Sequence, residues 1–403
     1  MPRVVVTGIG VVSAIGCTAT EFWTSLSRGV SGIAPLTLAD PALFRFKRGA
    51  EVRGHDPLAH FDARRADLLD RFAQFAVIAA RAAADDAGIE WTPRLRERTA
   101  VVTGSCVGGQ SSQDASFFHL YHEGRPSVHP LTIPRAMANA GASHVTVEFG
   151  ITGPSFTVST ACASSTHALG QAFWMVRSGV VDLALAGGSE APFSVGVLKA
   201  WDALRVVSPD TCRPFSRDRS GTILGEGAAM LVLEPRDAAR ARGARIWGEV
   251  LGFGMSSDAG HVTQPCPEGG ARAMRMALAD ARLPPEAVDY VNAHGTGTSA
   301  NDLAEARAIR AVFDRRADAL PVSSTKSMHG HALGAAGALE AAATLLALHH
   351  GVVPPTANCT EPDPQCGLDC VPNEARPASV EYALSNSFAF GGMNAVTAFG
   401  AAR

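Results

Sequence analysis

Short runs of Val, Ile and Leu alternate along the whole chain with segments whose apolar residues recur at helical spacing. Apolar runs bounded by glycine or polar residues are typical of buried strands. We expect strands at Val4–Gly8, Thr99–Thr103, Ser155–Ser159, Leu183–Ala186, Met230–Glu234, Trp247–Ser256, Val288–Asn292, Val322–Ser324, Ala383–Asn386 and Ala395–Phe399. We expect helices at Ala19–Leu26, Ala66–Ala87, Ala163–Ser178, Gly270–Arg282, Asp302–Phe313 and Gly330–His349. This alternation predicts a layered α/β fold.

The order of these elements suggests an internal duplication. The strand at Ser155–Thr160 runs into a helix of small residues at Cys162–Ser178, and Val322–Thr325 runs into Gly330–His349 in the same way. No strict sequence repeat accompanies this order. The length of 403 residues agrees with two domains or one large duplicated unit. We expect two halves, residues 1–245 and 246–403, divided after a short helix at Ala238–Arg242.

Composition and charge limit the classes of protein to which this chain can belong. Apolar residues make up 46% of the chain and charged residues only 18%, so a large core can form. The net charge of −3, without a run of like charges, gives no electrostatic footprint for nucleic acid. The eight cysteines are scattered without a disulfide framework, which predicts a cytoplasmic chain with reduced thiols.

Two apolar stretches could be mistaken for targeting or membrane segments. The start of the chain has Arg3 before an apolar run, but we favour a buried strand over a signal peptide. The stretch from Ala332 to Leu348 is shorter than the ~20 residues of a membrane span and contains Glu340. We therefore expect a helix buried inside the protein and no membrane association.

The segment Ser159–Ser165 contains the first candidate for chemistry. Cys162 is expected at the turn between a strand and a helix. A helix N-terminus favours a thiolate, which is the nucleophilic form of cysteine. Small neighbours would leave the sulfur accessible and let main-chain amides approach an oxyanion. A buried structural cysteine is the alternative, and the turn alone does not decide between the two.

Histidines follow two later strands. The segment Asn292–Thr298 has glycines around threonines at a strand end, where a loop can approach a ligand, and His294 is either a catalytic group or a core histidine. In Ser324–His331, Lys326 is one of only three lysines, and it precedes His331 by five residues. A nearby ammonium would keep His331 neutral and able to donate a hydrogen bond. We expect no metal site, because no third ligand accompanies the histidines at suggestive spacing.

The segment Asn386–Asn394 places aromatic residues in a glycine-rich turn between two strands. It is either core filling or a movable lid whose glycines act as a hinge. Taken together, a cysteine and two histidines at the ends of buried strands are a stronger signal than any one of them, because α/β sheets assemble their sites at such ends.

These four segments resemble the β-ketoacyl-[acyl carrier protein] synthases of the type II elongating kind. Arg213-Pro214-Phe215 and Gly225-Glu226-Gly227-Ala228 extend the match, which covers nearly the whole chain. The resemblance implies a thiolase-like duplicated α-β-α-β-α fold with mixed five-stranded sheets. It implies an acyltransferase for fatty acid, polyketide or polyene chain elongation, with an acyl carrier protein as partner and no cofactor beyond the phosphopantetheine of that carrier. It also implies a dimer, either a homodimer or a heterodimer with a subunit like a chain-length factor.

The resemblance also implies roles for individual residues. Cys162 would carry the growing acyl group, while His294 and His331 would hold the malonyl carbonyl during a decarboxylative Claisen condensation. The further residues it implies are Lys326 and Glu305 in support of the histidines, Phe390 and Phe388 at the oxyanion hole and gate, Thr296 and Thr298 on the pantetheine arm, Val107 in the acyl pocket, and Arg64 and Arg65 for carrier-protein docking.

Four positions depart from the pattern of this family. They are Ala389 where glycine is usual, Met393 for threonine, His329 for a small or hydroxyl residue, and Ser220 for an acidic one. The His-Gly-His sequence is similar to that of synthases in specialised pathways, such as aryl-polyene, type II polyketide and nodulation-factor systems. Three alternatives to a ketosynthase are a non-catalytic chain-length partner, a thiolase and a cysteine hydrolase. The presence of all three triad residues argues against the first, and His331 in place of a second cysteine argues against the second.

Overall fold

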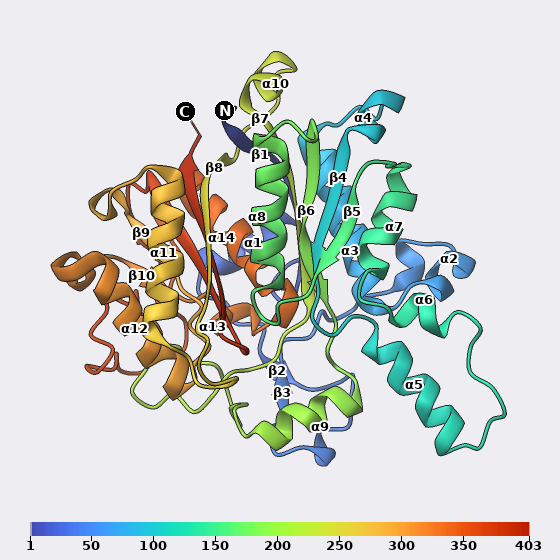
Figure 1. Cartoon of the computed structure of the whole chain (residues 1–403). Helices are drawn as coiled ribbons and strands as arrows, with labels where there is room; N and C mark the ends of the chain where they lie inside the picture. The colour runs from blue at the N-terminus through green and yellow to red at the C-terminus, as the bar shows by residue number, and fades with distance from the viewer. Residues whose placement is uncertain (1, 403) are drawn as a thin grey trace.

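The computed structural model describes residues 2–402, and within this range ten strands form one mixed sheet in the order β10-β9-β13-β14-β8-β1-β7-β6-β4-β5 (Figure 1). The strands are β1 (Val4–Ser13), β4 (Thr99–Gly104), β5 (Ser155–Val158), β6 (Leu183–Glu190), β7 (Gly227–Pro235), β8 (Gly248–Ser257), β9 (Tyr290–Asn292), β10 (Val322–Ser323), β13 (Tyr382–Ala389) and β14 (Met393–Ala401). Two short ribbons pair β2 (Ala34–Pro35) with β3 (Arg48–Gly49) and β11 (Val352–Val353) with β12 (Arg376–Pro377). Each apolar run that predicted a strand forms one, with shifted ends.

The strand order is the same in both halves of the chain. From its outer edge, each half runs third, second, fourth, fifth and first strand, counted along its own sequence. In each half the fifth strand, β7 or β14, is antiparallel to both neighbours, while the outer three strands are parallel. The duplicated fold with mixed five-stranded sheets is therefore confirmed, and pairing of β1 with β8 joins the two sheets edge to edge. For the domain division we propose residues 1–245 and 246–403, because this boundary lies between α10 (Arg236–Ala241) and β8.

Helices cover both faces of the sheet in each half, and two central helices lie between the two halves. The central pair, α8 (Ser164–Arg177) and α14 (Ala336–His350), contacts strands of both halves. On the outside, α3 (Arg71–Ala87) and α7 (Ala140–Phe149) cover the first half, and α11 (Pro267–Ala281) with α12 (Ser299–Phe313) covers the second (Figure 1). The contact of α3 with β1 is close enough that a Cβ on Gly10 would lie 1.9 Å from the Ala79 carbonyl oxygen.

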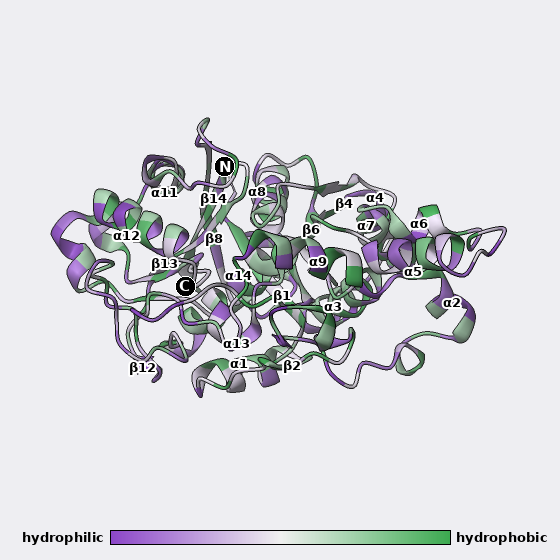
Figure 2. Ribbon diagram, turned by 90° about the horizontal axis from the view of Figure 1, so that it is seen from below, coloured by the Kyte–Doolittle hydropathy of each residue, from purple (hydrophilic) through white to green (hydrophobic). Residues whose placement is uncertain are grey.

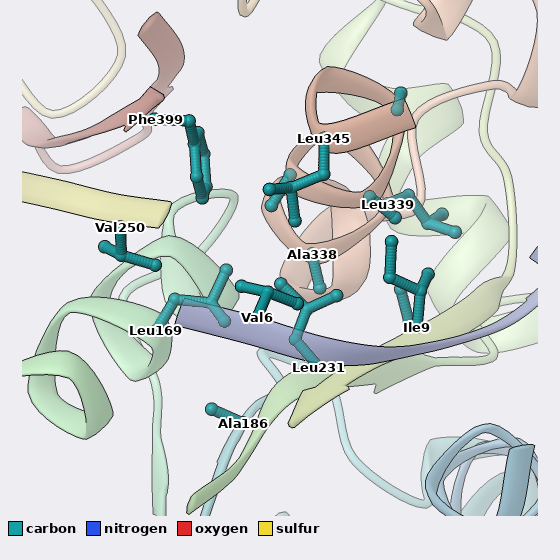
Figure 3. Close-up of a cluster of buried hydrophobic side chains, with 14 of the residues drawn as sticks. Val6, Ile9, Leu169, Ala186, Leu231, Val250, Ala338, Leu339, Leu345 and Phe399 are labelled. Carbon is teal, nitrogen blue, oxygen red and sulfur yellow. The ribbon is translucent and has the colours of Figure 1, made fainter. Parts of the chain in front are cut away.

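The apolar stretch near the C-terminal end is the core helix α14, as the sequence indicated. Figure 3 shows its side chains among those of the central layer: Ala338, Leu339 and Leu345 with Val6, Ile9, Leu169, Leu231 and Phe399. Surface helices such as α5 (Gln110–Tyr121) and α12 instead carry both hydrophilic and hydrophobic segments (Figure 2). Across residues 2–402, the structure contains no helix whose length and apolarity would allow it to cross a membrane.

Two predicted helices differ from the observed ones. The helix expected at Ala66–Ala87 is split into α2 (Ala63–Leu68) and α3, because Leu69 is extended and the Asp70 side chain caps α3 by accepting from the Phe72 amide. The helix expected from Gly330 starts only at Ala336, after the short α13 (Lys326–His329) and a 3-10 turn. The remaining helices are α1 (Ala19–Ser27), α4 (Pro93–Glu97), α6 (Thr132–Ala136) and α9 (Val195–Leu204).

Candidate active site

Cys162 lies in the turn between β5 and α8, where the sequence analysis placed it. Ala161 before it has φ +49°, a conformation that is uncommon for residues other than glycine. The Ser164 hydroxyl closes the turn, because it donates to the Ala161 carbonyl (2.6 Å) and accepts from the Thr160 amide (2.9 Å). The Cys162 side chain is buried in the protein, yet it lines a cavity that opens to the surface. The thiol is therefore presented to a ligand that enters this cavity.

Both predicted histidines reach the same cavity from the second half of the chain. His294 directly follows Ala293 at the end of β9, and His331 follows Gly330, whose φ of +69° ends α13. His331 Nε2 lies 3.1 Å from Cys162 Sγ, and the two imidazole rings are perpendicular with centroids 5.4 Å apart. One ligand atom from each of the three residues lies within 4.8 Å of the others. The structure thus brings together three side chains from the ends of three strands.

Lys326 determines which ring nitrogen of His294 carries the hydrogen. The lysine is fully buried, forms an ion pair with Glu340, and places Nζ 3.3 Å from His294 Nδ1. An ammonium group can only donate hydrogen bonds, so Nδ1 of His294 accepts. The ring hydrogen then lies on Nε2, which is the nitrogen left for a ligand in the cavity. His294 therefore presents a hydrogen-bond donor.

The electrostatics of the site keep both imidazoles neutral. Burial lowers the pKa of His294 and His331 well below the usual value, and the Lys326 charge lowers them further. This agrees with the prediction that a nearby ammonium keeps His331 uncharged. Burial also raises the pKa of the Cys162 thiol to about 11, against the opposing effects of Lys326 and the main-chain N–H of Phe390. Burial therefore opposes the thiolate that a helix N-terminus favours, and the resting group is the protonated thiol.

Glu305 supports the His294 loop through the main chain. Its carboxylate accepts from the amides of His294 (2.8 Å) and Gly295 (2.7 Å) and from the Asn386 side chain (3.1 Å). The carboxylate that pairs with Lys326 is instead Glu340 of α14, whose pKa burial raises to about 7. Sequence analysis did not assign Glu340 a role, although a single acidic residue in an otherwise apolar helix was a usable signal.

The four residues predicted for the gate and the pantetheine arm all line the cavity. The hydroxyls of Thr296 and Thr298 hydrogen-bond to each other (2.9 Å), and Thr298 also caps α12. The Phe388 ring lies 6.3 Å from the His294 ring. Phe390 lies in the turn between β13 and β14 and is 37% exposed, so it stands between the cavity and solvent.

Trp201 and five residues of the segment after β8 also line the cavity, and the sequence analysis missed them. The Trp201 ring stacks on Phe390 with centroids 6.1 Å apart and planes at 22°. The Val262 carbonyl accepts from the amide of Gly391 (2.7 Å), and the Asp258 amide donates to Gly392 (2.9 Å). These contacts join the turn to the segment after β8. The Asp258 carboxylate also accepts from the side chain of Asn394 (2.7 Å), and no motif marked this segment.

Val107 does not line this cavity. Its side chain packs against a separate apolar cluster that includes Leu198 and Leu333, and its amide donates to Glu190 (3.2 Å). The same buried carboxylate accepts from the amide of Gly334 (3.0 Å), so Glu190 ties the Val107 loop to the turn that follows His331. The acyl-pocket role of Val107 stays a prediction.

The two arginines predicted for docking differ in their surroundings. Arg64 of α2 is exposed to solvent. The guanidinium of Arg65 forms an ion pair with Glu148, which Arg81 also contacts, and lies over the Phe61 ring. Arg65 is therefore occupied within the fold, and Arg64 is the better placed of the two for a partner.

The donors of the site also bear on metal binding. A thiol and two imidazoles within 4.8 Å of one another are a set that zinc can use. Lys326 beside His294 places a positive charge next to that position, which opposes a second cation. His329 is not a free ligand, because Nδ1 donates to the Gly330 carbonyl (2.8 Å) and Nε2 accepts from Thr325 (3.0 Å). The donor set therefore suits hydrogen bonding to an oxyanion better than metal binding.

Comparison with known proteins gives two family matches and several close relatives. The family described as "Beta-ketoacyl synthase, N-terminal domain" matches residues 1–239, and "Beta-ketoacyl synthase, C-terminal domain" matches residues 247–360. Nodulation protein E of Rhizobium sp. (strain N33) is 47% identical over 397 residues, and 3-oxoacyl-[acyl-carrier-protein] synthase 2 of Staphylococcus aureus (strain COL) is 40% identical over 404, each alignment covering 98% of both chains. The solved structure titled "The ishigamide ketosynthase/chain length factor" is 40% identical, with a TM-score of 0.95 and complete coverage of both chains.

Proposed function

The chain belongs to the β-ketoacyl synthase family, and from this we propose how its site performs a decarboxylative condensation of a malonyl thioester with an acyl group on Cys162. The observation that supports the proposal is the approach of Cys162, His294 and His331 in one buried cavity. One nucleophile and two neutral imidazoles are what acyl transfer followed by enolate formation requires.

In the first half-reaction, Cys162 takes an acyl group from a carrier thioester. The resting thiol loses its proton to His331 Nε2, 3.1 Å away, as the sulfur attacks the acyl carbonyl. The amides of Cys162 and Phe390 face the sulfur and stabilise the oxyanion that forms. The bond between carbonyl and pantetheine sulfur then breaks, and the pantetheine thiol leaves with the proton.

In the second half-reaction, the malonyl carboxylate leaves as carbon dioxide. The electron pair of the broken carbon–carbon bond becomes an enolate, whose oxygen carries the new negative charge. His294 donates to this oxygen from Nε2, and His331 donates from the nitrogen that earlier accepted the thiol proton. Nδ1 of His331 has no hydrogen-bond partner among the described residues, so its ring can carry hydrogen on either nitrogen.

The condensation follows when the enolate carbon attacks the acyl-cysteine carbonyl. A carbon–carbon bond forms, the carbon–sulfur bond to Cys162 breaks, and the sulfur leaves as a thiolate, which takes a proton from solvent as the product departs. The β-ketoacyl product remains on the carrier. The burial of Cys162, His294 and His331 suits this step, because water would protonate the enolate before it attacked.

The partners follow from the substrates of this reaction. We propose that an acyl carrier protein delivers both thioesters through its phosphopantetheine arm, and that Thr296 and Thr298 contact the arm in the cavity. The names of the relatives, a 3-oxoacyl-[acyl-carrier-protein] synthase and a ketosynthase/chain length factor, support a carrier protein and a second related subunit. No separate cofactor is needed. A cytoplasmic location is part of the proposal, since a reducing compartment keeps the nucleophilic thiol free.

The test is intact-mass measurement of the purified protein offered acyl carrier thioesters of several chain lengths and degrees of saturation. We expect one acyl group to be added to the wild type and none to the variant Cys162→Ala. Addition to both proteins, or to neither with any thioester, would show that Cys162 is not the acyl carrier. A hydrolase would be indicated instead if the acyl group loads and is then lost to water while malonyl thioester is present, without formation of an elongated product.

A further inference from the structure

The mouth of the cavity carries an aromatic pair made by residues far apart in sequence. The Trp201 ring of α9 stacks on the Phe390 ring of the turn between β13 and β14, with centroids 6.1 Å apart and planes at 22°. Both side chains line the cavity that holds Cys162. This is the offset, nearly parallel arrangement that aromatic pairs favour.

Trp201 is mounted on a well-held helix. Leu198, one turn earlier in α9, is fully buried, and the Trp201 side chain itself packs against the apolar cluster around Leu198. The Asp202 carboxylate accepts from the amide of Arg45 (3.1 Å), and the amide of Gly196 donates to Asp114 (2.9 Å). The tryptophan ring therefore has a fixed position relative to the core.

The turn that carries Phe390 is held mainly by contacts with other segments of the chain. Gly391 and Gly392 have φ values of +86° and +70°, and Phe390 is itself 37% exposed. Besides main-chain bonds to Val262 and Asp258, the turn is held by the stack on Trp201. The main-chain N–H of Phe390 faces the Cys162 thiol, so the ring and the amide of one residue link Trp201 to the nucleophile.

We infer that Trp201 is a positioning residue, which holds the Phe390 turn so that the Phe390 amide points at the carbonyl bound to Cys162. The inference rests on the proposed function, in which that amide stabilises the oxyanion of acyl transfer. Removing the tryptophan ring would free the turn and leave the amide out of position for part of the time. Decarboxylation depends on His294 and His331 instead, and does not need this amide.

The experiment is a double-mutant cycle of W201A and F390A. The measured quantity is the rate of Cys162 acylation by the hexanoyl thioester of pantetheine, monitored by quenched flow and intact-mass measurement. We expect W201A to slow the acylation step about five- to tenfold with little change in KM, the range that an aromatic pair contributes. W201F should recover most of the rate, because a ring is restored. In the F390A background, W201A should have no further effect, since its partner ring is gone. Malonyl-thioester decarboxylation should slow much less than acylation in W201A.

A matched control is W23A, which removes a tryptophan stacked on His350 (centroids 4.7 Å apart) away from the cavity. It should leave acylation unchanged, and thermal melting of every variant should report intact folding. Equal slowing by W201A with and without Phe390, or equal slowing of acylation and decarboxylation, would overturn the inference. If the wild type loads with none of the thioesters in the panel described above, the proposed function fails separately. The same cycle is then read with iodoacetamide, whose attack also needs the thiolate that the Phe390 amide stabilises.

Discussion

Replacing Lys326 by methionine should impair malonyl decarboxylation more than acyl transfer. The lysine donates to His294 Nδ1 at 3.3 Å and so holds the ring hydrogen on Nε2, where the enolate oxygen forms. A hydrogen bond from a charged group is worth about 1.5–3 kcal/mol, and 2 kcal/mol corresponds to a rate change of about 30-fold. We therefore expect decarboxylation to slow by about 30-fold.

Acyl transfer should fall less in the same variant. Lys326 lowers the pKa of Cys162, but burial is the largest influence on that thiol and remains in the variant. The assay compares carbon dioxide release from a malonyl thioester with the rate of Cys162 acylation by mass. Equal losses, or a larger loss of acylation, would show that the lysine serves the thiol and would refute the assignment.

The pH dependence gives a second signature of this lysine. Its charge lowers the pKa of His294, so the imidazole stays neutral as pH falls through the usual range for histidine. Without the charge the pKa of His294 rises, although burial still holds it below the ordinary value. Decarboxylation by the variant should therefore lose activity at a higher pH than the wild type does. An acid limb at the same pH in both proteins would contradict this.

A paired variant separates catalysis from folding. Lys326→Met alone leaves Glu340 buried without its partner, and breaking a buried pair costs about 3–5 kcal/mol. Replacing both residues with methionine removes the uncompensated carboxylate and should restore most of the melting temperature. Because the donor to His294 is still missing, decarboxylation should stay slow in the paired variant. Recovery of decarboxylation along with stability would mean that the first loss came from folding.

Three further predictions concern the thiol and the docking helix. Cys162→Ala should abolish acyl transfer and keep malonyl decarboxylation, measured as carbon dioxide release, because the histidine pair remains; loss of both would place the cysteine in the decarboxylation step. Alkylation of Cys162 by iodoacetamide should rise about tenfold per pH unit from pH 7 toward its pKa of about 11, because only the thiolate reacts; a plateau below pH 8 would indicate a resting thiolate. Arg64→Glu should raise the KM for a carrier-bound thioester but not for a pantetheine thioester, and an equal change in KM for both substrates would reject docking there. Arg65→Glu should mainly lower the stability of the fold, by about 1 kcal/mol as measured by thermal melting, because the ion pair with Glu148 is lost.

The sequence predicted the sheet strands and placed Cys162 and the two histidines at strand ends because these features leave local signals, whereas their roles as a triad came from the family resemblance. Buried parallel strands are continuous apolar runs, and the ends of such strands meet at one place in the sheet. The charge state of Cys162 could not be predicted in this way, because it depends on how completely the surrounding elements remove water. The role of Glu340 depended on a contact across fourteen residues, and that of Trp201 on a contact with a turn 189 residues later. Neither leaves a trace in periodicity or local spacing.

The start of the helix that follows His331 shows the same limit at shorter range. Gly330 to Leu348 is uninterrupted in its apolar composition, so a helix from Gly330 was the expected result. The chain instead runs extended at His331, where its amide donates to the Ile223 carbonyl (2.7 Å) and its carbonyl accepts from Gly225 (2.9 Å). These two bonds to a distant segment aim the imidazole at Cys162, and they replace the helical hydrogen bonds that composition favoured.

The duplicated topology explains why the site needs both halves. Cys162 follows β5, the third strand of the first half, and precedes the central helix α8. His331 follows β10, the third strand of the second half, and precedes the central helix α14, so nucleophile and imidazole occupy corresponding places in the two units. In the same way His294 follows β9 where the Val107 loop follows β4, each the second strand of its half. Because the central helices α8 and α14 pack against each other, Cys162 and His331 meet across the middle of the molecule. The first half thus supplies the nucleophile and the second half supplies both hydrogen-bond donors, so neither half alone contains a complete site.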